Sequence, residues 1–504
     1  MNRELFKYFE NLADDWLFGS EKYQFQQLIG NYYLEINKVN KADSIKELNI
    51  IICDRNPVNF LAAFLAACTT NSQVFLCNPD WGENEWQYVL DLAEPDIILG
   101  QGAKYYLEHG LEYDLERRRQ GDTKTCKNSE SATHQHPFIM IPTGGSSGEI
   151  KFAIHTWETL MASVRGFTEY FQIKEVNSVC VLPLYHVSGL MQFMRAFTTG
   201  GKLVILPFKY LESGKILNIQ NIHYTDFFIS LVPTQLQRLL DNSSDKIDKN
   251  INAEININKY LAEFKAVLLG GAATWNELLE KAKFHKIKLA PTYGMTETAS
   301  QVVTLKPDHF LNGKLGCGQV LPHAEVIICD EEDNILPANN IGKIQIKSTS
   351  LALGYYSINY QNIKNNLNNN INNFSREYFF TDDVGYLDQD GYLHLIGRNS
   401  EKIISGGENI YPKEIEAAIR ATDMVIDICV IGLQDKYWGQ VVTAIYIPKY
   451  ANTSILAIQT ILKYKLSKFK IPKHWIPVTE LPRNHQGKVN RQKLYEIAIP
   501  LLQL

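Results

Sequence analysis

Residues 48–77, LNIIICDRNPVNFLAAFLAACTTNSQVFLC, place an apolar run, a helix-length stretch and a second apolar run one after another. The two runs, Leu48 to Cys53 and Gln73 to Cys77, are short and apolar, as buried strands are. The stretch Asn59 to Thr70 between them has the length of a helix. Strand, helix and strand in this order are typical of a parallel sheet with helices on its faces, so the segment predicts an α/β fold.

The same alternation continues along the chain. A helical stretch at Asn84 to Ala93 and a run at Asp96 to Leu99 follow, and later runs indicate one large α/β body that extends to about residue 398. These runs are Phe138 to Ile141, Val179 to Leu182, Lys202 to Leu206, Asp226 to Leu231 and Lys265 to Leu269. Polar segments with too few apolar residues to offset the entropy of ordering are predicted to be surface loops or partly disordered. They are Glu116 to His136, Asp241 to Lys259 and Asn359 to Asn373.

After Gly397-Arg398 the pattern changes to a shorter mixed unit. Helices are predicted at Pro412 to Ala421 and Ile455 to Ser467, and strands at Ile426 to Gly432 and Val441 to Ile447. A separate α+β domain of about a hundred residues fits this pattern. We therefore expect a large domain at residues 1–398 and a small domain at 399–504.

Composition limits the class of protein. No stretch approaches the roughly 18 to 20 apolar residues that a membrane helix needs, and residues 1–18 do not resemble a signal peptide. The expected location is the cytoplasm, or the plastid stroma if the gene is plastid-encoded. Eight cysteines are scattered without a CxxC pair, which argues against structural zinc and a disulfide framework. The basic segment 460–495 could meet phosphates or form a solvated helix face, and no nucleic acid is predicted as a partner.

A Gly/Ser-rich segment, Thr143-Gly-Gly-Ser-Ser-Gly-Glu-Ile-Lys151, follows a strand-like run and precedes a helical stretch that starts near Trp157. Consecutive small residues let backbone amides and hydroxyls surround a phosphate chain, and Lys151 adds a positive charge. The same composition also makes an ordinary turn between a strand and a helix. The segment lacks the GK[ST] ending of the P-loop of nucleotide hydrolases, so that family is disfavoured.

Two further motifs have both a chemical and a structural interpretation. In Tyr293-Gly-Met-Thr-Glu297 the aromatic ring can cover a purine, the threonine can reach a phosphate and the carboxylate can hold magnesium. The alternative is a loop with a capping threonine. In Thr381-Asp-Asp-Val-Gly385 an acid next to a glycine could accept ribose hydroxyls, or the segment could be a plain turn.

Two last motifs, Gly397-Arg398 with Lys402 to Pro412, and Pro482 to Arg491, complete an ordered set whose spacing is hard to obtain by chance. With Leu182 to Leu190 and Gly270 to Ala273, this set resembles the signature motifs of the adenylate-forming superfamily of acyl-CoA synthetases, adenylation domains and luciferases. The resemblance covers Phe138 to Leu494. HVSGL, YGMTETASQVVTL and ISGGENIYPKEIE are most similar to the o-succinylbenzoate–CoA ligases of menaquinone or phylloquinone synthesis.

The resemblance implies a magnesium-dependent enzyme with ATP, coenzyme A and an aromatic acid as substrates. It assigns the ATP phosphates to Thr143, Ser146, Ser147, Gly148 and Lys151. It assigns phosphate contact to Thr296, magnesium to Glu297, adenine to Gly271, Ala272, Ala273 and Tyr293, and ribose to Asp383 and Arg398. Lys488 is expected to bridge the acid and the α-phosphate.

The remaining assignments concern the acid and coenzyme A. The acid pocket is expected to involve His186, Ser188, Arg195, Gly270, Gly294 and Ser300. Ser400 takes the position of the interdomain hinge, and Ser405, Gly406, Gly407 and Glu408 are expected to line the pantetheine tunnel. The family rotates its small domain about the hinge between adenylation and thioester formation, which predicts that Lys488 leaves the site as the 405–408 loop arrives.

The chain departs from the family pattern at several positions. Ile150 stands where the phosphate loop usually has proline, and Ser147 replaces a threonine but keeps the hydroxyl. Asp382 replaces the glycine of the Thr-Gly-Asp ribose motif, which leaves the choice between Asp382 and Asp383 open. Another aryl- or acyl-CoA ligase and a catalytically idle nucleotide- or acyl-binding homologue are the alternatives for function, and a homo-oligomer is left open.

Two residues of the acid pocket have a competing interpretation. His186 could shape the pocket or be a satisfied core histidine. Ser188 and Arg195 lie seven residues apart in the predicted helix Val187 to Thr199, which puts them near one face. Arg195 could meet a second carboxylate of the acid, directly or through a water, or it could be an exposed arginine at a helix end.

Overall fold

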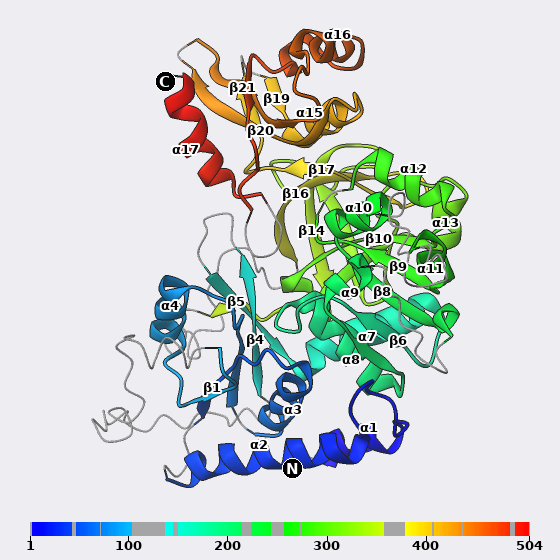
Figure 1. The fold of residues 1–504 in the computed structure, drawn as a ribbon, viewed down its shortest axis with the longest axis vertical. Coiled ribbons are helices and arrows are strands. Elements are labelled where there is room, and N and C mark those ends of the chain that lie inside the picture. The colour runs from blue at the N-terminus through cyan, green and yellow to red at the C-terminus, as the bar shows by residue number, and fades with distance from the viewer. Residues whose placement is uncertain are drawn as a thin grey trace.

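The computed structural model describes residues 3–42, 47–70, 72–102, 137–144, 150–213, 223–242, 257–272, 274–356, 378–405, 408–435, 437–483 and 489–502. In this part of the chain a large body carries a small C-terminal domain at one end, with helices α1 (Arg3–Glu10) and α2 (Lys22–Ala42) at the other (Figure 1). The predicted α/β body with a small α+β domain is confirmed. No helix within these ranges is both long and apolar enough to cross a membrane.

The first sheet contains the segment at residues 48–77, in the strand order β15-β5-β4-β2-β1-β3. The adjacent strands β4, β2, β1 and β3 pair in parallel, whereas β5 pairs antiparallel with both β4 and β15. Asn56 starts the crossover helix α3 (Pro57–Cys68), because its side chain accepts hydrogen bonds from two amides of the first turn. The strands are β1 (Leu48–Ile52), β2 (Ser72–Leu76), β3 (Ile97–Leu99), β4 (Phe138–Gly144), β5 (Ile150–Thr156) and β15 (Tyr355–Tyr356), and α4 (Glu83–Ala93) precedes β3.

The second sheet has the order β12-β11-β10-β9-β8-β6-β7 and is parallel from β7 to β10. Antiparallel β11 and β12 extend one edge. The strands are β6 (Asn177–Cys180), β7 (Leu203–Ile205), β8 (Phe227–Leu231), β9 (Ala266–Leu269), β10 (Leu289–Met295), β11 (Ser300–Thr304) and β12 (Gln319–Val320). Its helices are α7 (Trp157–Phe171), α8 (Val187–Thr199), α9 (Phe208–Glu212), α10 (Pro233–Asn242), α11 (Ile257–Glu263), α12 (Asn276–Phe284) and α13 (Pro307–Leu311), with a 3-10 turn at Tyr224–Asp226.

Helices join the two sheets into one core. Residues of α3 and α8 pack in the same buried cluster, where the rings of Phe64 and Phe193 meet edge to face at 6.2 Å. Phe167 of α7 packs on Phe228 of the second sheet at 5.1 Å between ring centres. The facing ends of the two sheets are thereby held in a fixed relation, which is what a site shared between them requires.

The last part of the large body is antiparallel. Strands β13 (Ala324–Cys329), β14 (Gly342–Ser348), β16 (Phe379–Leu387) and β17 (Leu393–Arg398) form a four-stranded sheet. In the described residues of the small domain, five strands form a sheet in which β21 pairs with β18, β20 and β22. The strands are β18 (Ile403–Ser405), β19 (Glu408–Ile410), β20 (Val425–Asp435), β21 (Gly439–Pro448) and β22 (His474–Pro477). Its helices are α15 (Pro412–Arg420), α16 (Ile455–Lys465) and α17 (Arg491–Leu502), with a 3-10 turn at Lys468–Lys470.

The polar segment 241–259 is only partly a loop, which corrects the prediction at its ends. Asp241 belongs to α10, and α11 begins at Ile257, which is buried. An isolated apolar residue can anchor a helix end when neighbouring elements cover it, as the second-sheet core covers Ile257. The segments 116–136 and 359–373, and residues 243–256, lie outside the described residues.

Candidate active site

The Gly/Ser-rich segment lies between two antiparallel strands. Thr143 near the end of β4 is paired with Lys151 at the start of β5, and Ser146, Ser147 and Gly148 lie outside the described residues. The element that follows the segment differs from the prediction, because the seven residues of strand β5 come before helix α7. A phosphate chain held here would meet Lys151 and the strand ends, and not the N-terminus of a helix.

Thr296 and Glu297 lie in a short 3-10 turn (Thr296–Thr298) directly after β10. Glu297 is 7% exposed, and the Tyr355 hydroxyl donates a hydrogen bond of 2.5 Å to its Oε1. Nε2 of the buried His155 donates to the carbonyl of Thr296 at 2.8 Å. Nζ of Lys151 lies 5.9 Å from the centre of the Tyr355 ring. The structure therefore brings both charged groups to one tyrosine, Lys151 near its ring and Glu297 at its hydroxyl.

The chemistry of the side chains at this turn decides whether magnesium fits. Within the described residues, no group of three or more His, Cys, Asp or Glu could hold a metal ion. Mg²⁺ is usually bound by one or two carboxylates together with substrate phosphates and waters. Glu297 supplies one carboxylate beside the cationic Lys151. The residues present therefore fit a magnesium ion that arrives with ATP.

The two adjacent acids of the ribose motif have different partners. Asp383 accepts a hydrogen bond of 2.9 Å from the Tyr293 hydroxyl, and its Oδ1 lies 3.3 Å from Nε of Arg398, its register partner on β17. Burial and the charge of Asp383 raise the pKa of Tyr293 well above its usual value, so this hydroxyl stays protonated and donates. The cluster joins the residues predicted to bind adenine and ribose.

Asp382 is attached to the hinge. Its Oδ1 accepts from the Ser400 amide at 3.0 Å, its Oδ2 accepts from the Ser400 hydroxyl, and its carbonyl accepts from the Asn399 amide at 2.8 Å. The two acids therefore differ in their surroundings, because Asp382 contacts the hinge residue Ser400 whereas Asp383 contacts Tyr293 and Arg398, which are predicted to bind adenine and ribose. Ribose binding is left to Asp383 as a prediction.

The predicted adenine segment follows β9. Gly271 has a φ of +80° and is exposed together with Ala272, whereas Ala273 lies outside the described residues. A Cβ at Gly270 would lie 2.4 Å from the Thr292 hydroxyl, and one at Gly294 would lie 2.1 Å from the Ser300 carbonyl. Gly270 and Gly294 are thus required by close packing, which is a structural reason for glycine at two positions predicted to line the acid pocket.

Arg195 is buried, so its interpretation as an exposed arginine is wrong. The side chain is 2% exposed, with Nη2 3.3 Å from Oε1 of Gln301 and 3.5 Å from Oγ of Ser300. Its guanidinium lies 4.0 Å from the centre of the Phe167 ring. Burial lowers the pKa of Arg195 to about 9. Among the described residues Nε of Arg195 has no hydrogen-bond partner, so this cation is incompletely satisfied.

His186 and Ser188, which are also predicted for the acid pocket, lie at the start of helix α8. His186 is the N-cap residue of α8 and is half-buried, with its ring 4.5 Å from that of Tyr185. This position is not that of a fully buried core histidine. Ser188 is also half-buried, and its carbonyl accepts from the side chain of Gln192 at 3.0 Å.

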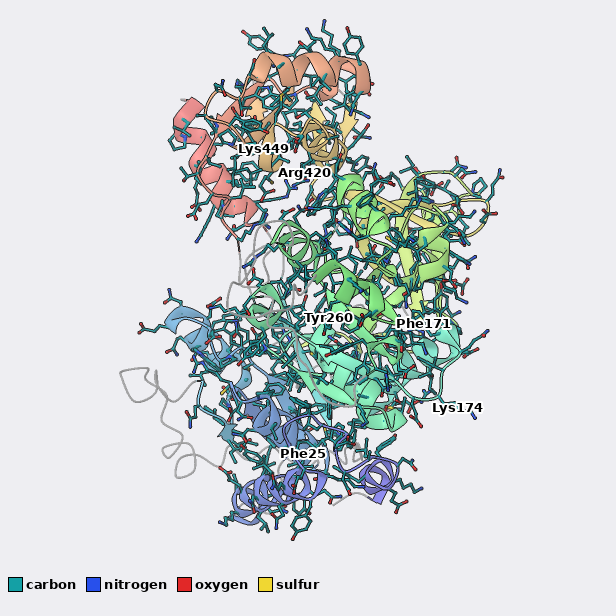
Figure 2. The ribbon with its side chains drawn as sticks, turned by 45° about the vertical axis from the view of Figure 1, so that its right-hand side comes forward. Phe25, Phe171, Lys174, Tyr260, Arg420 and Lys449 are labelled. Carbon is teal, nitrogen blue, oxygen red and sulfur yellow. The ribbon has the colours of Figure 1, made fainter. Side chains whose placement is uncertain are left out.

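Two of the residues predicted to line the pantetheine tunnel lie on one hairpin of the small domain. Ser405 and Glu408 are paired at the closed end of β18 and β19, whereas Gly406 and Gly407 lie outside the described residues. Lys488 also lies outside them, between Arg483 and Val489, which form a bridge. Arg420 of α15, labelled in Figure 2, reaches the large body, where its guanidinium is 5.5 Å from the ring centre of Trp275.

Four residues near these positions were assigned no role from the sequence: His155, Gln301, His323 and Tyr355, although Gln301 lies within the motif at residues 293–305. Tyr355 and His155 reach the Glu297 turn from β15 and β5, and Gln301 contacts Arg195. Burial and the charges of Arg195 and Arg165 lower the pKa of His323 to about 4. The partners of His155, Gln301 and Tyr355 lie 141, 106 and 58 residues away in the sequence. No local sequence pattern can therefore reveal these contacts.

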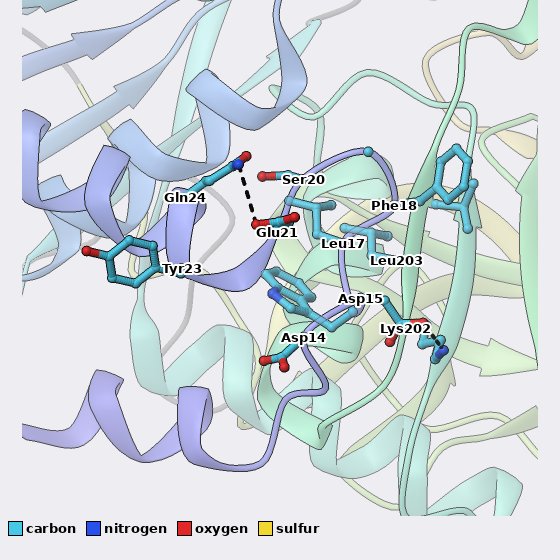
Figure 3. A pocket seen from close by; sticks show the side chains of 13 residues that line it. Asp14, Asp15, Leu17, Phe18, Ser20, Glu21, Tyr23, Gln24, Lys202 and Leu203 are labelled. Atoms are coloured by element: carbon cyan, nitrogen blue, oxygen red, sulfur yellow. Dashed lines mark hydrogen bonds and ion pairs between the residues drawn. The ribbon is translucent and has the colours of Figure 1, made fainter.

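A cavity of about 800 Å³ lies where the N-terminal segment around residues 14–24 meets strand β7 (Figure 3). Asp14, Asp15, Glu21 and Lys202 are among the residues that line it. None of the residues predicted from the motifs lines this cavity, so the chemistry described above is located elsewhere.

Comparison with known proteins relates this geometry to a family. The model of the AMP-binding enzymes matches residues 38–356, and that of the AMP-binding enzyme C-terminal domain matches residues 414–488. A 2-succinylbenzoate–CoA ligase of Listeria innocua is 34% identical over 410 residues, which cover 79% of this chain and 78% of the relative. Another from Geobacillus kaustophilus is 32% identical, with 74% and 70% covered. The structure of o-succinylbenzoate CoA synthetase from Bacillus subtilis with the acyl-adenylate OSB-AMP has a TM-score of 0.77, 22% identity and 98% coverage of both chains.

Proposed function

We propose that this chain, which belongs to the family of AMP-binding enzymes, is an ATP-dependent ligase that activates o-succinylbenzoate as its acyl-adenylate and transfers the acyl group to coenzyme A. The observation that carries the proposal is the meeting of Lys151 and Glu297 on one tyrosine, next to the Tyr293, Asp383 and Arg398 cluster. The substrate follows from the ligases of the same name that are at least 30% identical to the chain. The product would serve menaquinone or phylloquinone synthesis.

The first half-reaction makes a poor acyl donor reactive. A carboxylate oxygen attacks the α-phosphorus of ATP, pyrophosphate leaves, and the acyl group then has AMP as its leaving group. Magnesium held by Glu297 would neutralise charge on the phosphate oxygens. Lys151 and Thr296 are proposed to bind phosphate oxygens, and Lys488 to bridge the acid and the α-phosphate.

The second half-reaction requires access for a thiol. The sulfur of coenzyme A attacks the acyl carbonyl, AMP leaves, and the thiol proton is released to solvent. The hairpin of Ser405 and Glu408 belongs to the small domain, whereas Asp383 belongs to the large body. A rotation about Ser400 would replace Lys488 by this hairpin, which is the usual way to assemble two sites in turn.

Recognition of the acid is proposed to rest on Arg195. A buried guanidinium with an unsatisfied Nε is costly unless an anion meets it. The second carboxylate of o-succinylbenzoate has the charge and the geometry to do so. Ser300 and Gln301, which contact the guanidinium, would then be neutral partners at the same place.

The test is acid-dependent exchange of labelled pyrophosphate into ATP, with a panel of acids. The proposal predicts that o-succinylbenzoate supports exchange best and that AMP and a coenzyme A thioester accumulate when the thiol is added. Faster exchange with benzoate-like or fatty acids would identify another acyl-CoA ligase. ATP binding without exchange for any acid would identify an idle homologue.

A further inference from the structure

Tyr355 contacts two charged groups of the site, Lys151 and Glu297, although none of the motifs contains it. Its hydroxyl donates to Oε1 of Glu297 at 2.5 Å, and its ring lies 5.9 Å from Nζ of Lys151. The carboxylate therefore accepts a charge-assisted hydrogen bond on one oxygen, which is stronger than a neutral one.

The backbone just before Tyr355 is hydrogen-bonded to two elements, strand β5 and the turn at Glu297. Leu353 donates to the carbonyl of Ile154 on β5 at 2.8 Å, and Ile154 donates to the carbonyl of Gly354 at 2.9 Å. Ala352 donates to the carbonyl of Glu297 itself at 2.8 Å. The segment is thus a short tie between the strand that carries Lys151 and the turn that carries Glu297. Its position does not depend on the side-chain contact being tested.

The turn is also fixed at its own backbone. His155 donates to the carbonyl of Thr296, and the Ser350 hydroxyl donates to the carbonyl of Thr298 at 2.8 Å. With the backbone of the turn held, the remaining freedom of Glu297 is in its side-chain torsions. A hydrogen bond to one carboxylate oxygen restricts these torsions and so limits the directions in which the other oxygen can point.

We propose that Tyr355 is a positioning residue that orients the Glu297 carboxylate toward the magnesium ion of MgATP. This inference rests on the proposed assignment of Glu297 to magnesium. Partners that orient a metal ligand typically change metal affinity or activity by about tenfold to a hundredfold when they are removed.

The experiment compares Tyr355→Phe with the unaltered protein by calorimetry. The dissociation constant of ATP is measured at saturating magnesium and again in EDTA, and the magnesium concentration for half-maximal pyrophosphate exchange is measured at fixed ATP. We expect this magnesium concentration to rise about tenfold or more and MgATP binding to weaken, with ATP binding in EDTA unchanged. Equal weakening with and without magnesium, or a shift of less than about twofold, would overturn the inference.

Two controls separate orientation from general damage. Tyr170→Phe removes a hydroxyl that donates at the same distance, 2.5 Å, to the carbonyl of Thr304, so it should change thermal stability but not magnesium dependence. In a Glu297→Gln background, Tyr355→Phe should cause no further loss of MgATP affinity. A further loss there would show that Tyr355 acts independently of the carboxylate. Suppose that Tyr355→Phe weakens MgATP binding as expected, but that the unaltered protein shows no acid-dependent exchange. That result would refute the proposed function while supporting this inference.

Discussion

Arg195→Met is expected to change stability and substrate use in opposite directions. The side chain is 2% exposed, and its hydrogen-bond partners Ser300 and Gln301 are neutral. Burial lowers the pKa of Arg195 to about 9, so the charged guanidinium is destabilised by several kcal/mol at about 1.4 kcal/mol per tenfold change. Methionine fills similar volume without this penalty, and replacing an uncompensated buried charge by an apolar group is often stabilising. Without substrate, the midpoint of thermal unfolding should stay unchanged or rise.

The same substitution should weaken use of the diacid. Loss of a charge-assisted hydrogen bond amounts to roughly 1.5 to 3 kcal/mol, which is about a 10- to 150-fold fall in kcat/KM for o-succinylbenzoate. The assay is adenylation measured by pyrophosphate exchange, run in parallel with a monocarboxylate analogue, for which kcat/KM should barely change. Arg165→Met is the matched control, because Arg165 is an exposed partner of Glu158 on the neighbouring helix.

Three outcomes would refute the reasoning about Arg195. Equal loss on both acids would indicate damage to the fold, and no loss on either would place the second carboxylate elsewhere. A marked fall in the unfolding midpoint of Arg195→Met without substrate would show that the buried charge is already compensated inside the protein. The control should show neither the gain in stability nor the selective loss.

Other variants test the remaining parts of the site. Lys488→Ala should reduce adenylation by about 10² or more while thioester formation from supplied acyl-adenylate changes far less, and equal losses would contradict the rotation. Asp382→Gly removes two exposed hydrogen bonds to Ser400, so the ratio of the two half-reaction rates should shift by only a fewfold, and an unchanged ratio would show that the contact does not influence the hinge. The pKa of His323 is about 4 in the folded protein, so the unfolded chain binds a proton first as pH falls from 6.5 to 4. Stability should therefore fall by up to about 2 kcal/mol by pH 5, and His323→Asn should lose less, as denaturant titrations at pH 7 and 5 would show.

The sequence predicted much of the fold because its signals are local. The run Leu48 to Cys53 appears as β1, and the stretch Val187 to Thr199 is helix α8. Burial of a whole strand, or of one helix face, imposes a pattern on consecutive residues that can be read without knowing the partner. The small domain was located for the same reason, since its pattern changes abruptly near Arg398, although the boundary at residue 398 itself stays a prediction.

The motifs also identified the kinds of side chain expected at the site. Which of these side chains contact one another depends on how distant elements pack. Strand β5 escaped prediction because its residues lie between a Gly/Ser motif and a helix, and its identity depends on pairing with β4 and β15. Burial of Arg195 depends on Phe167 and Gln301, and the two roles of Asp382 and Asp383 depend on Ser400 and Tyr293. Local spacing cannot encode such contacts, because they form when strands and helices distant in sequence pack against one another.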